Sequence, residues 1–134
     1  MNKSLENRLK LIAGDSNVRC DEPMSSHCTF RAGGTAKYYV IPDEYTKVRD
    51  VLRLCVEENI PYYVIGNGSN LLVQDDGFDG VIIEIDSALA EIEINGNEIV
   101  AKAGAKLSKI AVKALNESLT GYEFAHGIPG NLGG

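Results

Sequence analysis

The loop from Gly66 to Asn70 carries the residue types in this chain that best suit binding of an anion. Glycine, asparagine and serine alternate there directly after the apolar run Tyr62–Ile65, which is typical of a buried strand. Glycines let the backbone approach a ligand closely and point several N–H groups at one place, and phosphate is the commonest biological anion. An ordinary turn between two strands is the alternative that the loop by itself leaves open.

The same loop does not match the dinucleotide fingerprint G-x-G-x-x-G. Gly66 and Gly68 fit, but position 71 is Leu, and the following Leu71–Val73 lacks helical spacing. We therefore expect an extended segment, a turn at Gln74–Gly77 and then a strand, without a helix to hold the phosphate. A phosphate bound here would lie on loop N–H groups and on the side chains of Ser69 and Asn70.

The preceding elements predict a parallel βαβ unit. Residues 37–41 read as a strand, and residues 45–58 carry apolar residues at helical spacing, with Cys55 on the apolar, core-facing stripe. The strands at 37–41 and 62–65 are expected to be parallel neighbours, and residues 81–85 supply a third strand. The Gly66–Asn70 loop then lies at the carboxyl end of a strand, the edge where open α/β sheets bind ligands.

The chain divides into three predicted regions. Residues 1–22 form an N-terminal helix, ended by Gly14, and a polar linker, and residues 23–86 form the parallel lobe. In residues 87–134, alternating residues flank the turn signal Asn95-Gly96, and a helix begins near Leu107 and is closed by Gly121. This antiparallel lobe ends in a Gly/Pro-rich loop with one hairpin and one helix, and we expect the natural protein to continue beyond it.

Composition limits the partners and the compartment. The net charge is −6 without a basic block, so nucleic acid is not an expected partner. Residues 1–13 do not resemble a signal peptide, and no run approaches the ~20 apolar residues of a membrane helix. The cysteines form no C-x-x-C, which favours free thiols in a reducing cytoplasm.

Histidine, cysteine and arginine residues elsewhere in the chain provide two further candidates for binding. His27, Cys28 and His126 have poor spacing for a metal site, and none is expected. Arg31, beside the Gly33-Gly34 pair, could meet a phosphate or carboxylate, but an ordinary surface arginine is the favoured interpretation.

Four motifs in order resemble the bacterial UDP-N-acetylenolpyruvoylglucosamine reductases, over roughly residues 23–134. They are Thr29–Gly34, Val64–Val73, Ala103–Ala105 with its helix, and Glu123–Gly130. The resemblance implies an α+β fold, the FAD-binding fold of the vanillyl-alcohol-oxidase (PCMH) type, with FAD between a parallel and an antiparallel lobe. It also implies that NADPH reduces the flavin, which passes hydride to the enolpyruvyl group of a UDP-sugar to form UDP-N-acetylmuramate for peptidoglycan. It predicts no further protein partner.

The resemblance also implies site residues. Those that would hold FAD are Gly66, Asn67, Gly68, Ser69 and Asn70 at the pyrophosphate, Ala103, Gly104 and Ala105 along the cleft, and Gly127, Ile128, Pro129 and Gly130 along the flavin ring.

The family's catalytic residues have no matching position here, so none is assigned and this chain alone is expected to be inactive. FAD is expected to be bound non-covalently rather than attached at His126. Asn131-Leu132 departs from the family pattern, which has a small residue and then an apolar one such as Val. Another flavin oxidoreductase of the same fold, or a non-catalytic nucleotide-binding module, are the alternatives.

Overall fold

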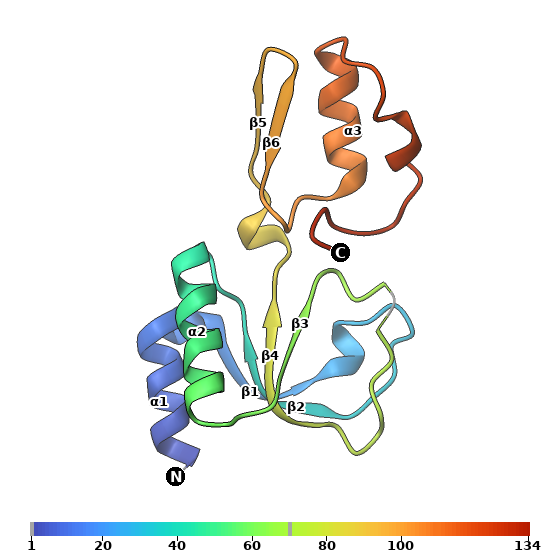
Figure 1. The fold of residues 1–134 in the computed structure, drawn as a ribbon. Helices are drawn as coiled ribbons and strands as arrows, with labels where there is room; N and C mark the ends of the chain where they lie inside the picture. The colour runs from blue at the N-terminus through green and yellow to red at the C-terminus, as the bar shows by residue number, and fades with distance from the viewer. Residues whose placement is uncertain (1, 70) are drawn as a thin grey trace.

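The computed structural model describes residues 2–69 and 71–134, which form two lobes stacked end to end (Figure 1). The first lobe (residues 2–86) holds a four-stranded sheet of order β1-β2-β4-β3, and the second lobe (residues 87–134) holds the two-stranded sheet β5-β6. The elements of the first lobe are α1 (Asn2–Ala13), η1 (Asp15–Asn17), β1 (Val18–Pro23), η2 (Met24–Ser26), β2 (Thr35–Val40), α2 (Tyr45–Glu57), β3 (Tyr62–Ile65) and β4 (Phe78–Glu84). Those of the second lobe are η3 (Ser87–Leu89), β5 (Ile92–Asn95), β6 (Glu98–Ala101), α3 (Leu107–Asn116) and η4 (Glu123–Ala125).

Strand β4 lies at the centre of the first sheet, between β2 and β3, and runs parallel to both. The expectation that β2 and β3 are adjacent is therefore wrong. The physical reason is burial: all residues of 80–83 are buried, and a strand covered on both faces and both edges belongs in the middle of a sheet. The predicted order of strand, helix and strand is still present, and the loop after β3 does lie at its carboxyl end (Figure 1).

Strand β1 occupies a segment that was expected to be a linker. It pairs antiparallel with β2, with Val18 opposite Val40 and Glu22 opposite Ala36. The strand is hard to recognise because Arg19, Cys20 and Asp21 are exposed along an edge, and its one buried residue is Val18. Helix α1 precedes it and ends as predicted, because Gly14 adopts a φ of 97° and donates its N–H to Lys10 O at 2.8 Å.

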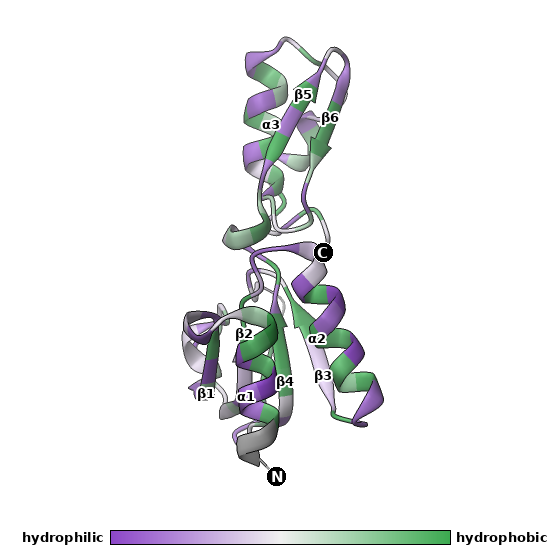
Figure 2. Cartoon of the chain, turned by 90° about the vertical axis from the view of Figure 1, so that its left-hand side faces the viewer, coloured by the Kyte–Doolittle hydropathy of each residue, from purple (hydrophilic) through white to green (hydrophobic). Residues whose placement is uncertain are grey.

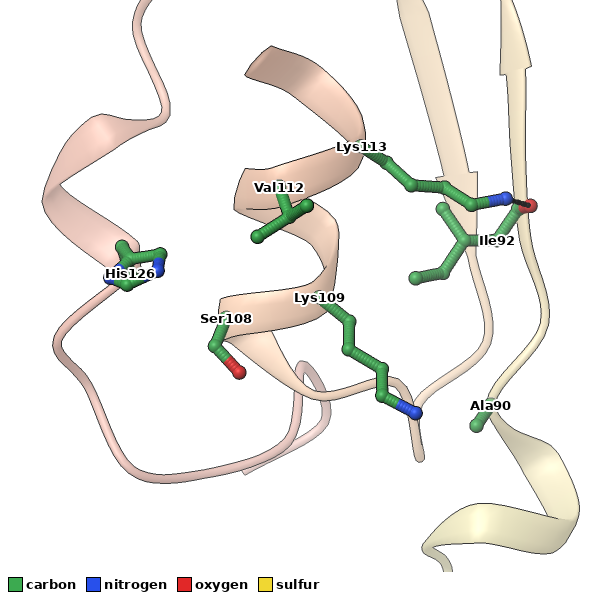
Figure 3. A pocket seen from close by; sticks show the side chains of 7 residues that line it. All are labelled: Ala90, Ile92, Ser108, Lys109, Val112, Lys113 and His126. Carbon is green, nitrogen blue, oxygen red and sulfur yellow. Dashed lines mark hydrogen bonds between the residues drawn. The ribbon is translucent and has the colours of Figure 1, made fainter. Parts of the chain in front are cut away.

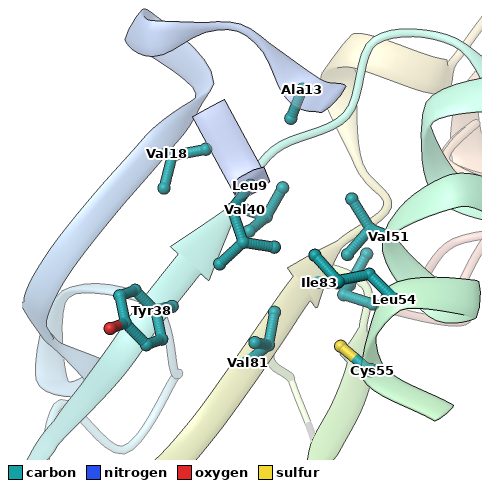
Figure 4. Packing of buried hydrophobic residues seen from close by; sticks show 10 residues of the cluster. All are labelled: Leu9, Ala13, Val18, Tyr38, Val40, Val51, Leu54, Cys55, Val81 and Ile83. Atoms are coloured by element: carbon teal, nitrogen blue, oxygen red, sulfur yellow. The ribbon is translucent and has the colours of Figure 1, made fainter. Parts of the chain in front are cut away.

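Alternate residues of the first sheet pack against different layers. One face is covered by α1 and α2, where Leu9, Val51 and Cys55 meet Val81 and Ile83 of β4 (Figure 4). The predicted placement of Cys55 in the core is confirmed, since the residue has no exposed surface. The opposite face is covered by η2 and the segment after the first glycine loop, through the cluster Met24, Ala36, Tyr39, Ile65 and Ile82.

The second lobe is a hairpin beside one helix, with a loop returning to the first lobe (Figures 1 and 2). The hairpin is confirmed, although its two-residue turn is Gly96-Asn97, with Gly96 at a φ of 61°, one residue later than predicted. Helix α3 ends at Asn116 rather than near Gly121, because Ser118 adopts a φ of 55° and Leu119 donates its N–H to Ala114 O at 2.8 Å. In the described part of the chain, no helix is long and apolar enough to cross a bilayer.

Candidate functional site

The first glycine loop, residues 66–70, leaves β3 at the edge of the sheet that faces the second lobe. Asn67 Oδ1 accepts the N–H of Ser69 at 3.1 Å, which holds the loop in a tight turn. No hydrogen bond between described residues uses the N–H of Asn67 or Gly68. Two free amide donors in one tight loop suit an anion, as the residue types suggested. Asn70, also predicted for this site, lies outside the described residues.

Gly68 is required by packing against His27 and Cys28, directly before the Thr29–Gly34 motif. It adopts a φ of 75°, and a Cβ built on it would clash with the carbonyl oxygen of His27. Thr29 donates its N–H to Gly68 O at 3.2 Å and ties the two segments together. The need for glycine at this position therefore comes first from the protein's own backbone, whereas sequence reasoning had attributed it to approach of a ligand.

Residues 128–130 of the second glycine loop (127–130) meet the first loop across a cavity of about 450 Å³, whereas Gly127 does not line this cavity. Ser69 Oγ donates to Pro129 O at 3.0 Å and joins the two loops directly. A Cβ at Gly127 or Gly130 would meet no atom within 4 Å, so these glycines border open space. No hydrogen bond between described residues uses their N–H groups either. We call this hollow the interlobe cavity; it is lined by Tyr63, Val64, Ile65, Gly66, Asn67, Gly68, Ser69, Leu71, Leu107, Ile128, Pro129, Gly130, Asn131 and Gly134.

The third predicted segment, Ala103–Ala105, reaches the junction of the lobes only in part. Ala103 lines a hollow of about 150 Å³ next to Gly66. Gly104 instead packs on the turn after β4, where a Cβ would clash with the carbonyl oxygens of Asp86 and Leu89, and Ala105 is fully buried. Gly104 and Ala105 line neither hollow, and their small size is explained by packing within the second lobe.

Asn131 is a site residue that sequence reasoning noticed only as a departure from the family pattern. It directly follows the second glycine loop and is 4% exposed. Its side-chain Nδ2 donates to Ile85 O at 3.0 Å and to Asp86 Oδ1 at 3.1 Å, both at the exit of β4. The sequence signal was present, because a bulky amide stood where a small residue was expected, but its partners lie 45 and 46 positions away.

Behind the first glycine loop lies a polar hollow of about 500 Å³ that also contains Arg31, His27 and Glu84. The structure thus brings Arg31 to the neighbourhood of Gly66 and Asn67, although the arginine itself is exposed. No group of three or more potential metal ligands gathers in the described residues, and His126 lies apart from His27 on the second lobe.

A half-buried network supports this hollow and was not predicted. His27 stacks on Tyr39 with ring centroids 4.1 Å apart, and its Nε2 lies 2.8 Å from Glu22 Oε1. Burial works to raise the pKa of the Glu22 carboxyl, but hydrogen bonds from His27 and Arg19 hold that pKa below its ordinary value. Burial, followed by the hydrogen bond that its hydroxyl donates to Glu84, raises the pKa of Tyr39 far above its ordinary value.

A larger hollow, about 580 Å³, runs along α3 and is separate from both glycine loops (Figure 3). His126 lies on one side of the helix and Ile92 on the other, and the Nζ of Lys113 is held by Ile92 O at 3.1 Å. This hollow is lined by neither glycine loop, whereas the interlobe cavity is lined by residues of both, so we take the interlobe cavity as the candidate site.

Comparison with known proteins shows which family and fold this chain is similar to. A family model described as an FAD binding domain matches residues 36–134. The chain is 45% identical over 136 residues to UDP-N-acetylenolpyruvoylglucosamine reductase of Clostridium kluyveri (strain NBRC 12016), covering 100% of this chain and 44% of the relative. The reductase of the same name from Clostridium novyi (strain NT) is 42% identical, covering 97% of this chain and 42% of the relative.

Solved structures give the same fold. The UDP-N-acetylenolpyruvylglucosamine reductase of Thermus caldophilus has a TM-score of 0.66 at 30% identity, covering 87% of this chain and 41% of that one. p-Cresol methylhydroxylase has a TM-score of 0.64 at 16% identity, covering 88% and 25%, and shows likeness of fold alone. The predicted PCMH-type fold and the family resemblance are confirmed, and the chain spans less than half the length of the curated relatives it matches.

Proposed function

Because this chain belongs to the FAD binding domain family, we propose that it is the FAD-binding part of a UDP-N-acetylenolpyruvoylglucosamine reductase that uses NADPH. The substrate is then the enolpyruvyl ether of UDP-N-acetylglucosamine and the product is UDP-N-acetylmuramate, a peptidoglycan precursor made in the cytoplasm. Relatives that are 42% and 45% identical over nearly the whole chain carry the reductase name and support this choice. The observation that carries the proposal is that two glycine loops line one cavity, with N–H groups at Asn67, Gly68 and Gly130 that bond no other residue in the described part of the chain.

The residues present fit an FAD molecule held between the lobes. Open space beside Gly130, which lines the interlobe cavity, admits a planar group against the backbone, since a Cβ at this position would meet nothing within 4 Å. Asn67 and Gly68 line the same cavity as Gly130, and their N–H groups bond no described residue. Such N–H groups suit the negative charge of a pyrophosphate. When bound, FAD supplies the hydride carrier between NADPH and the enolpyruvyl double bond.

The role of this chain in such a reaction is to bind and orient. The first glycine loop donates backbone N–H groups to the pyrophosphate, and Ser69 Oγ, which bonds Pro129 O at 3.0 Å, keeps the second loop at a set distance. Pro129 and Ile128 present apolar surface to the flavin ring, and the buried Asn131 and half-buried Leu107 complete the wall of the cavity. No residue of the described chain is assigned to proton transfer.

The proposal is tested on the complete protein, purified and handled without oxygen. It predicts a yellow protein whose colour passes into the supernatant on acid precipitation, because FAD is not covalently bound. NADPH should bleach the flavin band, and the enolpyruvyl UDP-sugar should restore it with formation of UDP-N-acetylmuramate.

Each contrary result has its own meaning. Bleaching by a 2-hydroxy acid or a phenol, and not by NADPH, would identify another oxidoreductase of the same fold. A protein that binds FAD and transfers no hydride would be a nucleotide-binding module. A protein without FAD would refute the assignment of the interlobe cavity.

A further inference from the structure

Asn131 connects the two lobes at the point where the two glycine loops meet. Its backbone belongs to the second lobe: Gly130 O and Leu132 N, on either side, bond Leu107 N at 3.1 Å and Ala105 O at 2.8 Å. Its side chain belongs to the first lobe, because Nδ2 bonds Ile85 O at 3.0 Å and Asp86 Oδ1 at 3.1 Å. One buried residue therefore links the start of α3 to the end of β4.

The link continues from Ile85 to the first glycine loop. Ile85 donates its N–H to Ile65 O at 2.8 Å, and Ile65 immediately precedes Gly66. Gly66 itself lies against the amide, since a Cβ built on it would be 3.3 Å from Asn131 Nδ2. The position of the Asn131 side chain thus limits how far the first glycine loop can move relative to the second.

The chemistry of the contact requires an amide donor. The Nδ2 group has two N–H bonds, and both of its partners, a carbonyl and a carboxylate, are acceptors only. The carbonyl oxygen Oδ1 is buried and has no donor among the described residues, so the side chain is held through its nitrogen alone. A serine or threonine could satisfy one acceptor at most, and a carboxylate could satisfy neither.

We propose that Asn131 is a positioning residue that sets the separation and angle of the two glycine loops, and through them the geometry of bound FAD. The inference rests on the proposed function, but it concerns a residue that departs from the family pattern and touches no reacting atom. The direct bond between the loops, from Ser69 Oγ to Pro129 O, is exposed and is therefore a weaker constraint than the buried contacts of Asn131.

The test exchanges donor and acceptor between Asn131 and Asp86 in the complete protein. N131D has nearly the same shape but places a carboxylate against Asp86 and Ile85 O, so it should raise the FAD dissociation constant at least tenfold at pH 8. D86N keeps an acceptor for Asn131 Nδ2 and should stay within threefold of wild type. The N131D/D86N double variant restores one donor–acceptor pair and should recover most of the loss.

The pH profile separates this role from simple damage to the fold. The carboxyl introduced by N131D beside Asp86 gains a raised pKa, and once protonated it can again donate. As the pH is lowered from 8 to 5, the ratio of the variant's FAD dissociation constant to that of wild type should therefore decrease toward one. N97D, the same substitution at the exposed hairpin turn, is the control and should match wild type at both pH values.

Flavin fluorescence quenching gives the dissociation constants, and the flavin absorbance envelope reports the geometry. A wild-type protein without FAD refutes the proposed function and the inference with it. Wild-type protein that binds FAD, with N131D unchanged or impaired equally at both pH values, refutes the inference alone. If N131D does not fold, N131A replaces it: a dissociation constant within twofold of wild type would equally overturn the positioning role, and a fivefold rise with a shifted absorbance envelope would support it.

Discussion

The two lobes are built from similar elements but are buried to very different degrees. In the first lobe, residues of both sheet faces are covered, and the two clusters of buried apolar residues found in the described chain lie there. In the second lobe, Leu115 is 75% exposed and Phe124 is 73% exposed, although α3 is amphipathic. The same periodicity that predicts a helix thus leads to a closed core in one lobe and an open apolar surface in the other.

The difference in burial indicates which lobe supplies most of the stability of the described chain and which residues border the ligand cavity. Burial of apolar surface is the main favourable term in folding, so the first lobe supplies most of the stability of the described chain. Gly68 of the first lobe is constrained by His27 and Gly104 of the second lobe by Asp86 and Leu89, whereas Gly127 and Gly130 of the second lobe border open space. The first lobe therefore acts as a stable base that carries one glycine loop of the cavity, and Gly130 of the second lobe adds open backbone surface to the same cavity.

Matched leucine substitutions test the contrast most strongly. Leu9 has no exposed surface, so Leu9→Ala should lower the free energy of unfolding by about 3 kcal/mol through lost contacts and a cavity. Leu115→Ala removes the same atoms from a side chain that is 75% exposed and should cost less than about 0.5 kcal/mol. Urea unfolding followed by circular dichroism measures both. Equal losses would show that the second lobe has a core of its own under solution conditions.

Matched glycine substitutions test the division between packing and binding. Gly68→Ala introduces a Cβ at positive φ against a backbone carbonyl and should destabilise the protein by about 2 kcal/mol. Gly130→Ala meets no protein atom and should leave the unfolding midpoint unchanged, while it weakens FAD binding about tenfold, or 1.4 kcal/mol. Thermal unfolding without FAD and fluorescence titration with FAD separate the effects. The division fails if Gly130→Ala unfolds early or binds FAD as wild type does.

The Glu22 carboxylate gives a pH test confined to the first lobe. Its pKa in the folded protein is lowered, so its contribution to stability is present above the ordinary carboxyl pKa of 4.5 and is lost as pH falls through the folded value. Glu22→Gln should cost about 1 kcal/mol at pH 7 and progressively less below pH 4.5. Unfolding curves at pH 7 and pH 3.5 are compared. A cost that stays constant across this range would argue against a Glu22 carboxylate stabilised by hydrogen bonds from His27 and Arg19.

The labelling rates of Cys55 and Cys20 compare a buried and an exposed thiol within the first lobe, and this is the smallest of the expected effects. Burial raises the pKa of the Cys55 thiol to about 11, so this residue should react only when the first lobe opens. Cys20 lies exposed on β1 and should be labelled in the native protein despite a pKa raised mainly by partial desolvation. Mass spectrometry of labelled peptides gives both rates. Leu9→Ala should accelerate labelling of Cys55 and leave Cys20 unchanged; acceleration by Leu115→Ala to the same extent would contradict the assignment of stability to the first lobe.

Several features of this protein were determined locally and could be predicted from the sequence alone. The apolar stripe of α2 has the period of a helix, Gly14 and Asn59 end helices by adopting positive φ, and the hairpin turn needs a glycine at residue 96. Each depends on residues within a few positions of one another. The two glycine loops were likewise visible, because glycine spacing after a strand is a local pattern.

Other features were decided by tertiary structure, because their causes lie far apart in the chain. Strand β1 is polar and becomes a strand only by pairing with β2, and β4 separates β2 from β3 because its buried run 80–83 needs cover on every side. The role of Asn131 depends on carbonyl and carboxylate groups of Ile85 and Asp86, which only the packing of one lobe on the other brings within hydrogen-bonding distance. The sequence shows that residue 131 is an asparagine, but only the tertiary structure brings its two hydrogen-bond acceptors, on Ile85 and Asp86, next to it.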